Sequence, residues 1–171
     1  MEEYWDVYDI FRNKTGKTIK RNSNIRLSQG EFHIVITGII QNSRKEILIT
    51  KRNEKKKLYP GLWECTSGSV KTNETSIEAA IREIKEEIGV EIKATEGFFI
   101  GTVKGNNYFR DVWKFEKNIT KNDIMYNDGE VIASKWVSLE KYTELYNRGQ
   151  IVPVGDFVIK MLKDKELEEE R

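Results

Sequence analysis

The sequence predicts a mixed α/β (α+β) fold in which helices pack on a mixed β-sheet. Segments rich in β-branched and aromatic residues recur along the chain, and other segments show helical spacing and capping residues. The β-rich segments form two blocks with one helix between them and two helices after them, an order typical of a sheet covered by helices. A length of 171 residues suits one core, so we expect a single domain over residues 1–171.

Composition and charge argue against several classes of protein. Charged residues make up 33% of the chain and aromatic residues 11%, which is typical of a folded globular protein. The net charge of +1 gives no indication of nucleic-acid or membrane partners, and we expect neither. No stretch approaches the roughly 20 apolar residues that span a bilayer, and residues 1–10 lack a signal-peptide pattern. The single cysteine, Cys65, fits a reducing compartment, so we expect a cytoplasmic location. For the oligomeric state we expect a monomer or a homodimer.

The first part of the chain predicts a hairpin followed by two longer strands. We expect residues 1–30 to form an N-terminal β extension, in which an apolar run at 5–11 precedes a turn at 13–18 that is rich in Asn, Thr and Gly. The segments FHIVITGII (32–40) and ILITKR (47–52) are rich in β-branched residues and predict two strands.

A central helix is predicted over about 75–88. Thr75 and Glu78 match a capping box, in which each side chain accepts a hydrogen bond from the backbone of the other residue. Gly89 suits the left-handed conformation that often ends a helix. The apolar residues recur at helical spacing and predict one buried stripe, which comprises Ile77, Ala80, Ile81, Ile84 and Ile88.

The remaining elements follow from the same patterns. The segment 63–70 is expected to contain a short strand that ends at Gly68. Further strands are expected at 97–103, 108–116 and 131–137. A helix over 138–149 begins with a serine cap, and a C-terminal helix is expected over 154–171.

Three carboxylates gather in the second half of the central helix, in the segment REIKEEIG (82–89). At 100° per residue, Glu83, Glu86 and Glu87 share a face beside the apolar stripe, and Lys85 points elsewhere. The position is unfavourable, since the helix dipole disfavours acids there and Glu83 and Glu87 repel at i,i+4. Helix geometry alone leaves two interpretations open: a solvated charged face, or a site for a hard cation.

The spacing around those acids distinguishes the two interpretations. Residues 68–90, GSVKTNETSIEAAIREIKEEIGV, resemble the Nudix box, G-x5-E-x7-R-E-U-x-E-E-x-G-U with U apolar, at every specified position. A chance match has a probability of roughly 10⁻⁸ per start position. The resemblance to the MutT-like Nudix hydrolases implies a Nudix-type α/β/α sandwich. It also implies metal-dependent hydrolysis of a diphosphate bond in a small molecule, usually a nucleoside diphosphate linked to another moiety.

The resemblance implies a role for each residue of the box that bears a functional group. Glu83, Glu86 and Glu87 match the ligands of Mg²⁺ or Mn²⁺, and Gly68 matches a residue that adds its backbone carbonyl. Glu83 matches a general base in some members, and Arg82 matches the residue that orients this glutamate. The chemistry fits, because divalent ions neutralise a diphosphate and lower the pKa of a bound water.

Residues outside the box are further candidates. Many Nudix enzymes take another acid from a loop across the cleft, which here implies Glu130 or Asp128 before the strand at 131–137. Glu130 is therefore a catalytic candidate, with a solvated loop acid as its alternative. Arg52 lies where family members often bind phosphate, with a surface ion pair as its alternative. Four aromatic residues can stack a nucleobase or pack in the core, namely Trp5, Tyr8, Tyr108 and Trp113.

Two other functions stay open on the sequence. The run WDVYDIFRNKTGKTIKR (5–21) resembles the opening of a Nudix subgroup related to isopentenyl-diphosphate isomerase. Those isomerases need a cysteine directly before the box glycine, where this chain has Ser67, and Cys65 lies two residues too early. A catalytically silent nucleotide-binding module with the Nudix fold is the other alternative, and the complete set of box acids argues against it.

Overall fold

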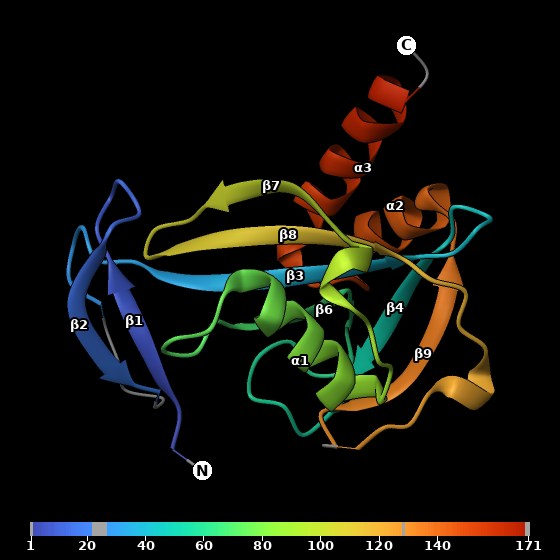
Figure 1. Ribbon diagram of the computed structural model, residues 1–171. Helices are drawn as coiled ribbons and strands as arrows, with labels where there is room; N and C mark the ends of the chain where they lie inside the picture. Colours follow the sequence, from blue (N-terminus) through green and yellow to red (C-terminus); the bar gives the residue numbers. More distant parts are fainter. Residues whose placement is uncertain (1, 22–26, 128, 170–171) are drawn as a thin grey trace.

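The computed structural model describes residues 2–21, 27–127 and 129–169, which form a large mixed sheet with helices on both faces and a small hairpin at one end (Figure 1). The strands of the large sheet are β3 (His33–Gln41), β4 (Ile47–Arg52), β5 (Trp63–Glu64), β6 (Thr66–Ser69), β7 (Gly97–Lys104), β8 (Tyr108–Glu116) and β9 (Val131–Val137). The hairpin consists of β1 (Tyr4–Tyr8) and β2 (Lys14–Lys20). The helices are α1 (Ser76–Ile88), α2 (Leu139–Asn147) and α3 (Asp156–Glu169).

The large sheet is mixed, as the sequence predicts. Strand β3 lies at its centre and runs parallel to β8, whereas every other pairing described in the sheet is antiparallel. The main strand order is β5-β4-β3-β8-β7, with β6 also paired to β3 and β9 also paired to β4. Segments far apart in the sequence therefore meet along β3 and β4.

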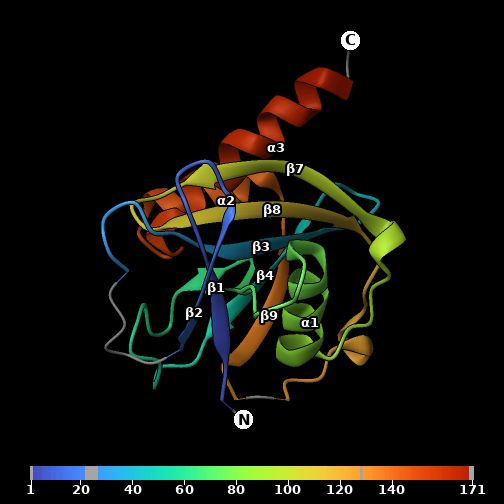
Figure 2. The ribbon, with the colours of Figure 1, turned by 60° about the vertical axis from the view of Figure 1, so that its left-hand side comes forward.

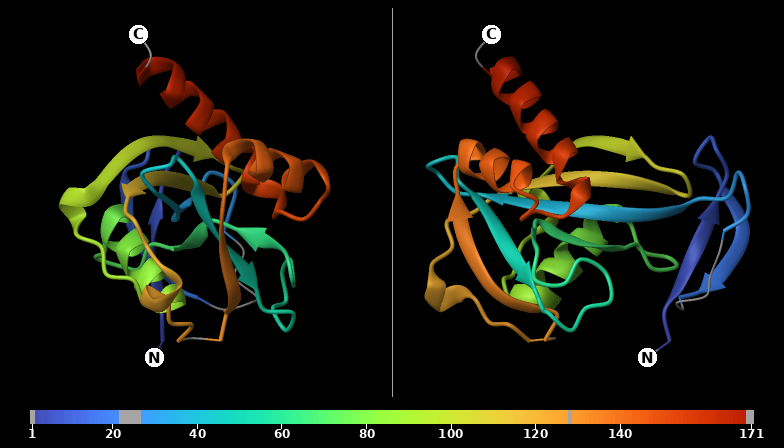
Figure 3. Two further views of the ribbon diagram at one scale, coloured as in Figure 1. Left: turned by 90° about the vertical axis from the view of Figure 1, so that its right-hand side faces the viewer. Right: turned by 180° about the vertical axis from the view of Figure 1, so that it is seen from behind.

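The helices cover opposite faces of this sheet and form an α/β/α sandwich (Figures 1 and 3). On one face, the stripe of α1 packs on β3, with Ile84 and Ile88 fully buried against Ile34 and Ile36. The other face packs against α2 and α3 through a second cluster that includes Tyr142. This architecture confirms the predicted fold class. No helix among the described residues has the length and apolar character needed to cross a membrane.

Helix α1 begins and ends where its sequence predicts. The Glu78 backbone N–H donates to Thr75 Oγ1 at 3.4 Å, and the Thr75 backbone N–H donates to Glu78 Oε2 at 2.8 Å. Gly89 takes the left-handed conformation with φ of 72° and donates its N–H to the Lys85 carbonyl. The capping box and the glycine thus fix the register of the helix that carries the three acids.

Three boundaries differ from the sequence-based predictions. The hairpin turn lies at residues 9–13 and not at 13–18, because the Asp9 carboxylate accepts hydrogen bonds from Phe11 and Asn13 and closes the turn there. The strand expected at 63–70 is two strands, since β5 pairs with β4 and β6 pairs with β3. Helix α3 begins at Asp156 because a 3₁₀ turn occupies Pro153–Gly155.

The hairpin crosses one end of the large sheet (Figure 2). Tyr8 and Phe32 exchange backbone hydrogen bonds of 2.8 and 2.9 Å, and the Thr72 N–H donates to the Tyr4 carbonyl at 2.8 Å. At the hairpin turn, Arg12 forms an ion pair with the buried Asp111 of β8. The contact of Tyr4 with Thr72 brings the ends of the hairpin next to the loop that precedes α1.

Candidate active site

Glu83, Glu86 and Glu87 of α1 border one cavity of about 270 Å³ beside β6. Elements from across the chain close it: the hairpin ends, the end of β4 and the loop after it, and the residue before β9. The lining residues that bear functional groups are Glu3, Arg21, Arg52, Lys56, Glu64, Ser67, Gly68, Glu83, Glu86, Glu87 and Glu130. The predicted ligands Gly68, Glu83, Glu86 and Glu87 therefore line one cavity together with Arg52 and Glu130. Arg82 does not line it but donates hydrogen bonds to Glu83 and Glu86.

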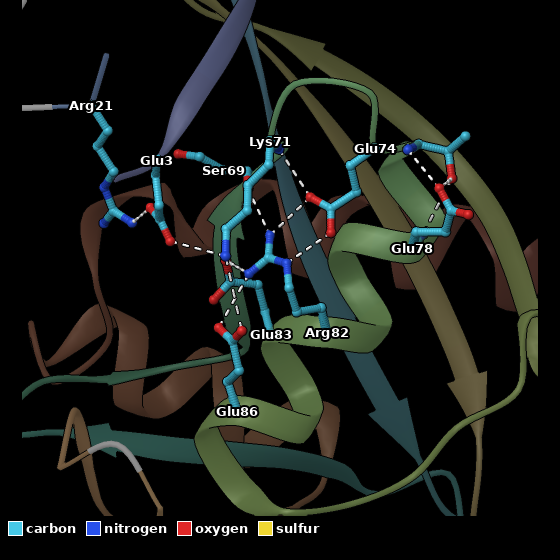
Figure 4. Close-up of polar contacts among 10 residues, drawn as sticks. Glu3, Arg21, Ser69, Lys71, Glu74, Glu78, Arg82, Glu83 and Glu86 are labelled. Carbon is cyan, nitrogen blue, oxygen red and sulfur yellow. Dashed lines mark hydrogen bonds and ion pairs between the residues drawn. The ribbon is translucent and has the colours of Figure 1, made fainter. Parts of the chain in front are cut away.

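Arg82 is the centre of the polar network beneath the cavity (Figure 4). Its guanidinium donates to both carboxylate oxygens of Glu74, at 2.7 and 2.9 Å, and to the Ser69 carbonyl at 3.0 Å. It also donates to Glu83 at 2.7 Å and to Glu86 at 3.2 Å. Arg82 thus ties the loop before α1 to the acids of α1, with Glu74 as the brace.

Electrostatics in this network follow burial and pairing. Burial raises the pKa of Glu83, and the neighbouring Arg82 opposes part of that rise. Burial alone would lower the pKa of Arg82, but hydrogen bonds to Glu74 and Glu83 outweigh it and raise that pKa. Arg82 therefore stays charged, and its positive charge stabilises the ionised form of Glu83.

The other two acids of α1 have different surroundings. Glu87 is only 5% exposed and accepts a hydrogen bond of 2.9 Å from the Thr66 hydroxyl on β6. The Glu86 side chain is half-exposed and lies 3.9 Å from the Lys71 ammonium, which also contacts Glu3 of the hairpin at 2.9 Å. Glu87 is held in place by the fold, whereas Glu86 faces the open part of the cavity.

Gly68 has a steric role in addition to its backbone. A Cβ built at this position would overlap the carboxylate of Glu83. The missing side chain therefore lets Glu83 lie directly against β6, next to the backbone of Gly68. The atoms nearest to a Cβ at Gly68 all belong to Glu83.

The residues present fit a hard divalent cation by the chemistry of their donors. The three glutamates and the carbonyl of Gly68 offer only oxygen ligands, which Mg²⁺ and Mn²⁺ prefer. In the described residues, no three His, Cys, Asp or Glu side chains converge closely enough to hold a metal in their present positions. In this arrangement Glu83 lies 2.7 Å from the Arg82 guanidinium and Glu86 lies 3.9 Å from the Lys71 ammonium.

The wall opposite α1 combines basic and acidic side chains. Arg52 forms an ion pair with the buried Glu64 and donates from Nε to the Leu58 carbonyl at 3.1 Å. Lys56 lies 2.6 Å from Glu130, which is half-exposed at the cavity edge. Arg52 forms an ion pair, as the alternative interpretation expects, but this pair does not lie at the surface because its partner Glu64 is buried. Asp128, the other loop acid named from the sequence, lies outside the described residues.

Sequence analysis missed several residues of this cavity. Glu3 and Arg21 come from the hairpin ends and form an ion pair of 2.5 Å at the rim. Glu64 was missed as well, because nothing in its local pattern distinguishes it from other surface charges. Only strand pairing brings these segments to α1, so no signal within one element could have found them.

The aromatic candidates separate clearly. Trp5 stacks on His33 with ring centroids 4.4 Å apart, Tyr8 is buried, and Trp113 donates to the Ser76 hydroxyl at 3.2 Å. Tyr108 lines a second cavity of about 420 Å³. A larger cavity of about 580 Å³ near Trp136 has no acidic side chain among its lining residues and does not fit metal-dependent chemistry.

Cys65 is not one of the residues that line the cavity of the acids. It is 3% exposed and packs in the cluster of Tyr142 beneath α2. Burial raises the pKa of Cys65 to about 12, and the nearby Glu64 adds to the rise. Ser67, which precedes the box glycine, lines the cavity, and its hydroxyl lies 3.2 Å from that of Thr37. The position directly before the box glycine, where the isomerases need a cysteine thiol, therefore carries the hydroxyl of Ser67.

Comparison with known proteins identifies the family. The sequence profile of the NUDIX domain matches residues 31–154, which is most of the chain. An uncharacterized Nudix hydrolase of Listeria monocytogenes is 34% identical over 159 residues, covering 90% of this chain and 89% of its own. The isopentenyl-diphosphate Δ-isomerase of Escherichia coli is 28% identical over 114 residues, which is 63% of each chain.

Solved structures show the same fold. The crystal structure of DR0079 from Deinococcus radiodurans superposes with a TM-score of 0.71 at 20% identity, covering 87% of this chain and 91% of that one. The chain therefore belongs to the Nudix hydrolase family, as its box predicts. Membership defines the general class of activity as hydrolysis of a pyrophosphate bond.

Proposed function

We propose that this chain hydrolyses the diphosphate bond of a small molecule, such as a nucleoside diphosphate linked to another moiety, with Mg²⁺ or Mn²⁺ as cofactor. The observation that carries the proposal is the cavity at which the three acids of α1 face Arg52 and Lys56. Hydrolysis of a diphosphate uses acids that bind divalent ions and basic side chains that bind the phosphate oxygens.

Gly68, Glu83, Glu86 and Glu87 would hold the metal ions. When bound, the ions supply charge neutralisation of the diphosphate and lower the pKa of a water molecule. Arg82 orients Glu83 from behind through the hydrogen bond of 2.7 Å between them. Glu87 is preorganised by Thr66, while the exposed Glu86 can turn from Lys71 into the cavity.

The chain's own residues also handle the proton and the phosphates. Water attacks phosphorus as one P–O bond of the diphosphate bridge breaks, and a carboxylate accepts the proton of that water. Glu83 and Glu130 are the two candidates for this base, because they lie on opposite sides of the same cavity. Arg52 binds the phosphate oxygens as they gain charge, with Lys56 beside it.

The test is hydrolysis of a panel of diphosphate substrates with and without Mg²⁺ or Mn²⁺. The panel contains ADP-ribose, nucleotide sugars, dinucleoside polyphosphates, nucleoside triphosphates and isopentenyl diphosphate. Glu86→Gln should lower kcat by about 100-fold or more, because a neutral amide is a poor ligand of hard cations. The matched control is Glu91→Gln, since Glu91 is an exposed acid just after α1 that pairs with Lys85.

The outcomes separate the candidate functions. Metal-dependent cleavage that Glu86→Gln abolishes and Glu91→Gln retains supports the proposal. Isomerisation of isopentenyl diphosphate without cleavage would support the isomerase, which the buried Cys65 disfavours. Tight binding without turnover would indicate a silent module. The cytoplasmic location and the choice between monomer and homodimer stay predictions from the sequence.

A further inference from the structure

A second cavity of about 420 Å³ adjoins the first on the face of the sheet that carries α2 and α3. The two cavities share Arg52, Glu64 and the β6 segment 67–69 as lining residues. The floor of the second cavity comes from β3 and β8, and its walls come from the loop after β4 and the connection between α2 and α3. A molecule that lies in the first cavity can therefore extend around β6 into the second.

Arg110 of β8 is the charged residue in the floor of this second cavity. Its Nη1 atom donates to the Thr37 hydroxyl at 3.0 Å and to the Ile36 carbonyl at 3.3 Å. Its Nε atom is buried and has no hydrogen-bond partner within the described part of the chain. Tyr108 and Phe157 lie against the guanidinium, with ring centroids 5.4 and 5.6 Å from Cζ.

The positive charge of Arg110 is not neutralised by an ion pair among the described residues. Among the lining residues of this cavity the acid is Glu64, and its carboxylate is already paired with Arg52. Burial lowers the pKa of Arg110, because holding this charge away from water costs free energy. A fold that needed only packing here would place an apolar side chain on this strand, as it does at Val112.

The distance between Arg110 and β6, the strand that carries Gly68, suits a small group attached to the diphosphate. Ser69 pairs with Val35, and Val35 pairs with Arg110 in the adjacent strand. Two strand spacings place the Arg110 backbone about 10 Å from β6, and the arginine side chain shortens that gap. One sugar ring or a similar group attached to the diphosphate can span it.

We infer that this second cavity binds the moiety attached to the diphosphate, and that Arg110 selects a moiety bearing an anionic oxyacid group, a carboxylate or a phosphate. The inference rests on the proposed function, because it takes the diphosphate to lie in the first cavity. Tyr59 and Tyr108, which line the same cavity, provide flat surfaces for the ring of that moiety.

Matched substrate pairs test this selection. UDP-glucuronate and UDP-glucose differ by one carboxylate on the attached sugar, and ADP-ribose 1″-phosphate differs from ADP-ribose by one phosphate on the terminal ribose. The wild-type enzyme should prefer the acidic member of at least one pair by about tenfold or more in kcat/KM. The pair that shows the preference distinguishes a carboxylate from a phosphate.

Variants locate the selectivity. Arg110→Gln should reduce the preference to about one, because kcat/KM for the acidic member should fall about tenfold further than kcat/KM for the neutral member. Arg110→Lys keeps the charge without the planar fork and should retain part of the preference. Arg44→Gln is the matched control, because Arg44 is an exposed arginine in the turn after β3, at the far end of that strand, and should leave the preference unchanged.

Calorimetric binding of all four compounds in Ca²⁺ separates failure of this inference from failure of the proposed function. If the wild type cleaves none of them, the dissociation constants of the acidic and neutral members still report the selection. Equal affinity and equal kcat/KM within both pairs, or a preference that Arg110→Gln leaves intact, would overturn the role of Arg110. Failure of both acidic compounds to bind would do the same.

Discussion

At the scale of single residues, the site depends on how closely Gly68 and Glu83 approach each other. The glycine leaves space for the carboxylate against β6, and Arg82 holds that carboxylate from the other side. The acid is therefore fixed by one missing side chain and one ion pair. This arrangement gives a physical reason for glycine at the start of the box that is additional to its carbonyl.

Gly68→Ala is expected to displace Glu83 and to lower kcat by about 10-fold or more, because a 1 Å shift of a catalytic group costs this much or more. The melting temperature should change little, since Glu83 can rotate toward solvent at the cavity. Steady-state kinetics and a thermal melt on the same preparations check this. Wild-type kcat in Gly68→Ala would show that the contact has no functional role.

At the scale of elements, helix α1 concentrates acids at its negative end, where they are least stable. The contacts of the fold offset this cost. Arg82 pairs with Glu83 and Glu86, and Lys71 approaches Glu86 from the loop before the helix. Lys85 turns away and pairs with Glu91, as its helical position predicts. Lys85 therefore leaves the charges of Glu83, Glu86 and Glu87 unneutralised, although it lies on the same helix.

An ion pair between Arg12 and the buried Asp111 links the hairpin turn to the sheet, in addition to the backbone hydrogen bonds between Tyr8 and Phe32. Asp111 is 1% exposed and accepts hydrogen bonds from Arg12 and, at 2.8 Å, from the Thr102 hydroxyl. Arg12→Ala leaves this carboxylate with the hydroxyl alone and should lower the free energy of unfolding by about 2 kcal/mol.

Urea denaturation measures this loss against a matched control, Lys17→Ala, which removes an exposed pair with Glu31. The control should change the free energy of unfolding by less than about 0.5 kcal/mol. Equal effects of the two substitutions would mean that the buried pair contributes no more than a surface pair. The hairpin also brings Glu3 and Arg21 to the cavity, so Arg12→Ala should lower kcat/KM as well.

At the scale of the whole molecule, stability should depend on pH through His33. This histidine stacks on Trp5, and its Nδ1 atom is buried without a hydrogen-bond partner in the described residues. Burial, together with the charge of Arg110, lowers the pKa of His33 from 6.5 to about 4. The folded protein therefore binds a proton less readily than the unfolded chain, and acid favours unfolding between these two pKa values.

The stability contribution of neutral His33 is complete above pH 6.5 and declines as the pH falls toward 4. At pH 5 the loss should reach about 1–2 kcal/mol. His33→Phe retains a ring against Trp5 but cannot bind a proton, so its stability should fall less than that of the wild type over this range. Parallel unfolding curves at pH 7.5, 6 and 5 measure the difference, and identical pH slopes would contradict the assignment.

Much of the fold could be predicted because its signals are local. The limits of α1 follow from Thr75, Glu78 and Gly89, and its buried face follows from apolar residues at helical spacing. The hairpin turn and the split between β5 and β6 could not be predicted this way. Both depend on which neighbour each strand pairs with, and that choice is not encoded within a single segment. The division of the chain into one domain stays a prediction.

The sequence by itself determined the family, the helix that carries the acids and the identity of the candidate metal ligands, because all of these lie within 23 consecutive residues, 68–90. Only the tertiary structure decided what surrounds them. The pairing of β3 with β6 and β8 brings Gly68 and Arg110 to adjoining cavities, and the hairpin adds Glu3 and Arg21. Local patterns set helices and caps, whereas contacts between distant segments depend on the register of the whole sheet.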